Sequence, residues 1–143
     1  MQPDFDAFFQ AYAETFNRAL AGEPVFDTIM GHFTDAFIGA APGVVNCGRN
    51  GEAFRAVLEQ GYAFYRQIGT KRMNVRSVEA TPIDPLHNMA KVSFRADYEK
   101  DGRAIAIDFD VTYLLQTHED GPKIFAFISG DEMAAFREHG LVD

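Results

Sequence analysis

The sequence predicts an α+β fold in which helices pack on one face of a curved antiparallel sheet. Up to Gly69, apolar residues recur at helical spacing, and from about residue 71 they alternate with polar residues. The length of 143 residues is typical of one domain. A hydrophobic content of 47%, which includes fourteen Phe and five Tyr, is sufficient for a packed aromatic core.

Two helices are expected before the first strand. Residues 4–20 read as a helix with Asp4 as its N-cap and Gly22 as its stop. Pro24 opens a second, short helix, because proline is favoured in the first helical turn. The apolar face of the first helix consists of Phe5, Phe8, Phe9, Tyr12, Phe16 and Leu20.

The next segments alternate between strand and helix. Residues 36–40 are expected to form a short strand, followed by a loop that could hold one more. Asn50 is expected to cap a third helix that ends at Gly69. A last helix is expected over 131–139, with Asp131 at its N-cap. The period-two segments predict strands at 71–82, 88–100, 103–118 and 123–129.

The dipeptide Asp101-Gly102 predicts a two-residue hairpin turn and thereby fixes a register. In that register five cross-strand pairs lie on one face, which we take as the inner face: Tyr98–Ile105, Ala96–Ile107, Phe94–Phe109, Val92–Val111 and Ala90–Tyr113. A slip by one residue would move all of them to the other face.

The opposite face of this hairpin carries the charges. Asp108 falls opposite Arg95, and Asp110 falls opposite Ser93 and diagonal to Lys91. We therefore expect both carboxylates on the outer, solvated face. The alternative is a catalytic carboxylate pair, which would need a dry cleft and shifted pKa values.

A second turn at Asp120-Gly121 gives a register for the last strand. It places Ile124, Ala126 and Ile128 inside, and Phe125 and Phe127 outside. Exposed apolar side chains on a sheet face favour a homodimer interface, expected here through Met89, Leu114, Phe125 and Phe127. A longer loop would turn this strand over and make the same residues core.

Charge and cysteine content limit the partners and the compartment. The net charge of −8 argues against nucleic acid and anionic membranes, which require a basic surface. The start of the sequence lacks the pattern of a signal peptide, and a cytoplasmic protein is expected. Cys47 cannot form a disulfide within the chain, and it is either inert or, at a helix N-terminus beside Arg49, a weak nucleophile.

The order of these elements resembles the nuclear transport factor 2-like (SnoaL-like, ketosteroid-isomerase-like) superfamily. The matching pieces are "FDAFFQAYAETFNRALAG", "HFTDAFIG", "GEAFRAVLEQGYAFYRQIG" and "AIDFDVTYLLQTHEDGPKIFAFI". The resemblance implies one cone-shaped domain over residues 1–143, with the N-terminal helices on the concave face of the sheet. Members include isomerases, dehydratases, polyketide cyclases and binding or dimerisation modules, so the fold does not select a function.

The sequence departs from the isomerase pattern. The base carboxylate of those members would fall on Ala41, and no acid lies on the predicted inner strand faces. Asp35 is nearby, but its place in a turn favours a structural role. The candidates for acid–base chemistry are therefore Tyr113, Tyr98, His32 and Asp35.

We expect an apolar, aromatic cavity between helices and sheet. Its predicted lining is Tyr12, Phe16, Phe37, Phe94, Tyr98, Phe109 and Tyr113. The four histidines are scattered without ligand spacing, so neither a metal nor a cofactor is predicted. Three hypotheses follow: a protein that binds a small hydrophobic ligand; a cofactor-free isomerase, dehydratase or cyclase; and a dimeric interaction module with a filled core.

Overall fold

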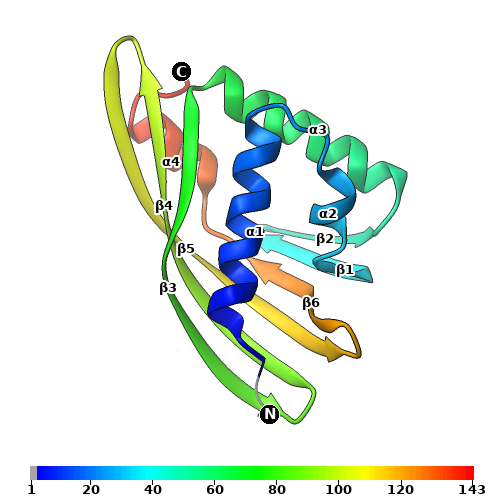
Figure 1. Ribbon diagram of the computed structural model, residues 1–143. Coiled ribbons are helices and arrows are strands. Elements are labelled where there is room, and N and C mark those ends of the chain that lie inside the picture. Colours follow the sequence, from blue (N-terminus) through cyan, green and yellow to red (C-terminus); the bar gives the residue numbers. More distant parts are fainter. Residues whose placement is uncertain (1–2) are drawn as a thin grey trace.

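The computed structural model describes residues 3–143 as helices on one side of a six-stranded sheet (Figure 1). The helices are α1 (Phe5–Leu20), α2 (Phe26–Met30), α3 (Glu52–Gln67) and α4 (Glu132–Glu138). The strands are β1 (Phe33–Ala41), β2 (Val44–Arg49), β3 (Thr70–Asp84), β4 (His87–Lys100), β5 (Arg103–His118) and β6 (Gly121–Ile128). In the described range no helix is long and apolar enough to cross a bilayer.

The sheet is mixed, whereas the sequence predicted an antiparallel one. Its strand order is β2-β1-β6-β5-β4-β3, and the β3–β6 meander is antiparallel as predicted. β1 pairs with β6 in parallel, with Phe33 opposite Ile124. Parallel neighbours need a long crossover, which here is the whole segment from β2 to β5. Periodicity within one strand contains no information about such a distant partner.

The β4–β5 hairpin has the predicted register. All five apolar pairs occur, and Asp101 and Gly102 both adopt positive φ, at 53° and 76°. Positive φ at both central residues is the geometry of a type I′ turn. Phe94 is only 1% exposed, whereas Asp108 lies at the surface. The inner and outer faces of this hairpin are therefore confirmed.

The turn before β6 is centred on Glu119-Asp120, not on Asp120-Gly121 as predicted. Phe125 lies outside as predicted, with its ring 5.9 Å from that of His87, but the predicted faces of the residues after Phe125 are wrong. Ile124 is buried opposite Leu115, but the register then shifts by one residue, and Phe127 lies opposite the inward-facing Tyr113. Phe127 consequently packs against the core, and Ile128 is exposed. The cause is a β-bulge at Phe125, because one extra residue on a strand reverses the alternation of faces beyond it.

Two of the three predicted helix caps are confirmed. The Asp4 carboxylate accepts a hydrogen bond from the amide of Ala7, and the Asp131 carboxylate accepts one from the amide of Ala134. Asn50 does not cap α3. Its side-chain amide instead donates to the carbonyls of Met30 and Phe33, which fastens the end of α2 to the start of β1.

The core lies between the helices and the concave face of the sheet (Figure 1). It has two clusters of buried side chains, one around Phe9, Phe94 and Tyr113 and a smaller one around Tyr98 and Phe136. Among the half-buried residues that pack against both clusters are Tyr65 on α3 and Phe109 on β5. These two residues therefore mark the seam between the clusters.

Candidate functional site

All five tyrosines of the chain lie in the interior. Tyr12 comes from α1, Tyr62 and Tyr65 from α3, Tyr98 from β4 and Tyr113 from β5. They face inward because each lies on the apolar face of its helix or at a strand position whose side chain points to the inner face of the sheet. Phenolic groups are thus concentrated in one place, although burying a hydroxyl is unfavourable unless it is hydrogen bonded.

The rings of Tyr12 and Tyr113 pack edge to face, with their centroids 6.1 Å apart. Burial raises the pKa of Tyr12 from 10.0 to about 12. Burial also raises the pKa of Tyr113 well above its ordinary value, and the neighbouring Tyr12, Tyr65 and Tyr62 raise it further. Both phenols stay protonated at neutral pH, so they can donate a hydrogen bond to a ligand.

His32 lies beside Tyr12 at one end of this group. Its ring centroid is 5.5 Å from that of Tyr12 and 5.2 Å from that of Phe8. Its Nδ1 is 2.9 Å from the carbonyl oxygen of Thr28, and because a carbonyl only accepts, Nδ1 carries the proton. Burial lowers the pKa of His32. The imidazole is therefore neutral near pH 7 and offers Nε2 as an acceptor.

Glu132 lies at the other end, in the first turn of α4. The Tyr65 hydroxyl donates to its Oε1 over 2.6 Å. Glu132 is an exposed residue whose carboxylate lies against Tyr65, and a partial loss of hydration there raises the carboxyl pKa. Burial raises the pKa of Tyr98, and the negative charge of Glu132 adds to that effect.

The sequence analysis missed Glu132, Tyr65 and Tyr62 as site residues. Glu132 follows a helix cap, and an acid at that position is normally a solvated residue of the first helical turn. A usable signal existed for the tyrosines, because positions 62 and 65 are three apart in a helix and so share one face. Both rings do pack on Phe16, at centroid distances of 5.1 and 5.6 Å.

The structure brings most of the predicted lining together. The rings of Phe94 and Phe109 stack at 5.3 Å, and Phe94 is 6.5 Å from Tyr113. Phe37 is buried in a different corner, against Phe33 and Phe54. Asp35 is exposed on β1 and is not brought to the other candidates.

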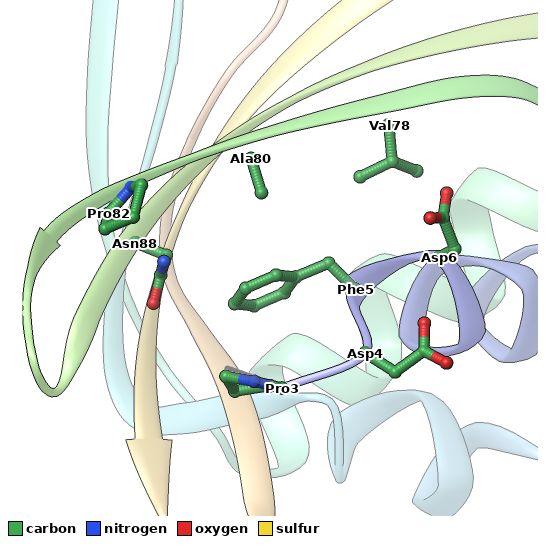
Figure 2. A pocket seen from close by; sticks show the side chains of 8 residues that line it. All are labelled: Pro3, Asp4, Phe5, Asp6, Val78, Ala80, Pro82 and Asn88. Carbon is green, nitrogen blue, oxygen red and sulfur yellow. The ribbon is translucent and has the colours of Figure 1, made fainter. Parts of the chain in front are cut away.

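Two surface pockets occur away from the tyrosines. One pocket, of about 290 Å³, lies where the start of α1 meets the end of β3 and the start of β4 (Figure 2). Figure 2 shows the Phe5 ring directed toward Ala80 and Asn88, with the carboxylates of Asp4 and Asp6 directed away. Asp4 already serves as the helix cap and is not free to bind a ligand there.

The other pocket, of about 500 Å³, is a groove between α1 and β3. Several of its polar side chains already bond within the protein: Arg18 pairs with Glu23 at 3.2 Å, and Asn17 bonds both backbone groups of Met73. Neither pocket contains a predicted ligand-binding residue. We take the tyrosine group as the candidate site, because its hydroxyls and carboxylate are concentrated where ordinary core packing requires none.

The sequence profile of the NTF2-like protein family DUF6841 matches residues 3–132. The chain belongs to this family. A comparison with curated protein sequences found no significant match. Membership agrees with the curved sheet and concave-face helices, and the cystatin-like fold named for one structural neighbour agrees with the same architecture.

Solved structures of similar fold share little sequence with this family member. An NTF-2 like protein of unknown function from Shewanella oneidensis MR-1 has a TM-score of 0.68 and 15% identity, over 89% of this chain and 96% of that chain. A ketosteroid isomerase-like protein from Erwinia carotovora atroseptica has a TM-score of 0.60 and 15% identity, over 87% and 91%. An uncharacterized protein from Caulobacter vibrioides has a TM-score of 0.62 and 18% identity, over 96% and 94%.

Proposed function

We propose that this NTF2-like protein binds a small, mostly apolar molecule between its helices and its sheet. The observation that supports this most is the gathering of tyrosines in the interior, where Tyr12 and Tyr113 pack ring against ring and the Tyr65 hydroxyl donates to Glu132. Aromatic walls provide apolar contact, and a few convergent polar groups orient the ligand, as in most small-molecule sites.

The seam between the two core clusters is the proposed point of entry. β6 ends opposite Thr112, so Phe109 has no β6 residue beside it. Phe109 faces inward yet is only half-buried, and so is Tyr65 on the helix side. A ligand that separates these two rings would reach the tyrosine hydroxyls without unfolding either cluster.

A cofactor-free acid–base enzyme is the second candidate. The neutral His32 beside Tyr12 favours it, since an imidazole nitrogen and a phenol can move a proton between two atoms of a bound molecule. The ketosteroid isomerase-like neighbour has the same fold, which by itself leaves the reaction open.

We also propose that residues 1–143 act as one cytoplasmic domain that dimerises through the outer sheet face. Phe127 is not part of this interface because it lies inside. The registers and ring contacts place other apolar side chains on the outer face, and we call them the outer patch: Ile38, Val45, Met89, Leu114, Phe125 and Ile128. Val45 is 70% exposed and Ile128 is 54% exposed, so a second copy would bury considerable apolar area.

Titration with benzyl alcohol tests the ligand proposal. The protein would be labelled on its five tyrosine rings and followed by NMR. We expect saturable shifts of Tyr12, Tyr65 and Tyr113, and weaker binding in the Tyr65→Phe variant, which keeps the ring and loses the hydroxyl. Tyrosine signals that stay unchanged at every concentration would favour the third hypothesis, a filled core.

A further inference from the structure

β3 is the outermost strand at one end of the sheet, so one of its edges has no neighbouring strand. The side chain of Asn17 on α1 bonds to this edge. It accepts a hydrogen bond from the amide of Met73 over 2.7 Å and donates one to the carbonyl of Met73 over 2.9 Å. The backbone groups of Met73 therefore face away from β4. In an antiparallel strand, the backbone groups of every second residue face the same side.

Four residues of β3 beyond Met73 also direct their backbone groups to the free edge. Met73 pairs with Ala96, so the even-numbered residues of β4 do not bond to β3. The hydrogen bond from the Glu99 amide to the Gly69 carbonyl, at 2.8 Å, agrees with this, because it joins an odd-numbered residue of β4 to the start of β3. The residues paired with even-numbered positions of β4 are Val75, Val78, Ala80 and Pro82.

Only a short part of this edge is open. Three features protect the rest: the bonds of Asn17 to Met73, a bulge at Arg76 and the missing amide hydrogen of Pro82. Such features keep other chains from pairing with an edge strand. Val78 and Ala80 lie between the bulge and the proline. Within residues 3–143, no side chain bonds to their backbone, and no strand pairs with them on this side.

The pocket of about 290 Å³ lies beside this open stretch (Figure 2). Val78 and Ala80 line it from the strand, and Phe5 lines it from the start of α1. Both strand residues lie opposite fully buried residues of β4, so their side chains are on the inner face of the sheet. An inward side chain of an added strand would therefore enter this pocket. The charged residues of the described lining are Asp4 and Asp6, and it contains no lysine, arginine or histidine.

We propose that this open edge binds an extended, basic peptide segment of a partner protein by strand addition. The backbone of the segment pairs with Val78 and Ala80, and its alternate side chains point to the pocket. A lysine or arginine fits there, since its apolar stem can lie on Phe5 while its charged head stays at the rim. Asp6 is the carboxylate for this head group, because it is exposed, whereas Asp4 is committed to the helix cap.

Charge distinguishes this occupant from a second copy of the chain. The protein has a net charge of −8, which attracts a basic segment. Two β3 edges paired antiparallel would bring the acidic rims of both pockets together, and like charges oppose such a contact. The edge is also separate from the tyrosine group, so the proposal does not depend on a ligand in the interior.

The test uses a peptide with blocked ends in which threonine occupies every second position and valine, lysine and valine lie between. The full chain would be labelled on its backbone amides and followed by NMR during titration. We expect saturable shifts and slower hydrogen exchange of the Val78 and Ala80 amides, because a bonded amide is protected. A peptide with glutamate in place of the lysine should bind at least about threefold more weakly.

Two variants test the contacts separately. Asp6→Asn should weaken binding of the lysine peptide at least about threefold, because it removes the charge at the rim. The matched control is Glu138→Gln at the exposed end of α4, which should leave the affinity unchanged. Ala80→Pro removes the edge-facing amide hydrogen and should abolish binding. Pro82 already occupies an equivalent position two residues further on, so proline is compatible with this edge.

Measurements on the unmodified protein decide the matter even if a variant fails to fold. Amides of Val78 and Ala80 that do not respond to the lysine peptide would overturn strand addition. Equal affinity for the glutamate peptide would overturn the basic partner. Protection of the same two amides that increases with protein concentration, in the absence of peptide, would identify a second copy as the occupant and overturn the proposal as well.

Discussion

The ring of Phe127 lies directly over Gly39 in the neighbouring parallel strand. A Cβ built on Gly39 would come within 2.6 Å of the Phe127 Cζ atom. The two residues are paired in the β1–β6 register, and both face the helices. This contact holds Phe127 inside and fixes which face of β6 joins the core.

Gly39→Ala should destabilise the protein by roughly 1–3 kcal/mol, because the added methyl group overpacks the Phe127 ring. The matched control is Gly61→Ala in α3, where nothing lies within 4 Å of the added carbon. This control should stabilise the helix by about 0.5–1 kcal/mol. Urea unfolding measures both, and a Gly39→Ala protein as stable as the control would mean that Phe127 points outward.

Alkaline pH should unfold the protein through its buried phenols. The pKa of Tyr12 is raised from 10.0 in the unfolded chain to about 12 in the folded protein. Because only the unfolded state ionises in that interval, stability is unchanged below pH 10 and is lost between pH 10 and about 12. Near-ultraviolet phenolate absorbance should therefore rise together with loss of circular dichroism. Phenolate formation at pH 10 in folded protein would show that the hydroxyls are solvated.

Asp108→Asn should leave ligand affinity unchanged. Its carboxylate lies on the outer face, where hydrogen bonding to Arg95 and the charge of Arg76 lower its pKa. Exposed pairs of this kind contribute little to stability, so the thermal midpoint should shift only slightly. Calorimetry with benzyl alcohol is the measurement, with Tyr65→Phe as the positive control. A large loss of affinity would instead support the alternative in which Asp108 and Asp110 form a functional carboxylate pair.

Self-association through the outer patch should be abolished by Ile128→Lys. The substitution places a charge on β6, between the strands that carry Ile38 and Leu114, and desolvating that charge opposes pairing of two copies. Leu86→Lys is the control, because Leu86 is 55% exposed on the β3–β4 turn, outside the patch. Light scattering after gel filtration gives the mass. An Ile128→Lys protein with the mass of a dimer would exclude this interface.

The first hairpin was predictable because two independent patterns agreed on one register. The turn at Asp101-Gly102 and the match of Arg95 with Asp108 each specify the same pairing. The second hairpin offered only the dipeptide Asp120-Gly121, and the turn in fact lies one residue earlier, because His118 pairs with Gly121. A single bulged residue, Phe125, is also invisible to periodicity. The parallel pairing of β1 with β6 could not be predicted from local pattern either, because the paired residues Phe33 and Ile124 are some ninety residues apart in the sequence.

The part of the candidate site that lies on the sheet was predictable. The alternation of inner and outer side chains along a strand is enough to place four of its residues: Tyr98, Tyr113, Phe94 and Phe109. The helix half depends on how α3 and α4 are rotated and where they pack, which no single segment encodes. Glu132 is the clearest case, because as a residue in the first turn of a surface helix it resembles any solvated acid.

A crystal structure with para-bromobenzyl alcohol tests the central claim most directly, because anomalous scattering locates the bromine without ambiguity. We expect the bromine at the seam beside Tyr65 and Phe109, with the hydroxyl directed to the tyrosines. A bromine found only in the pocket beside Phe5, or only on the outer face of the sheet, would contradict it.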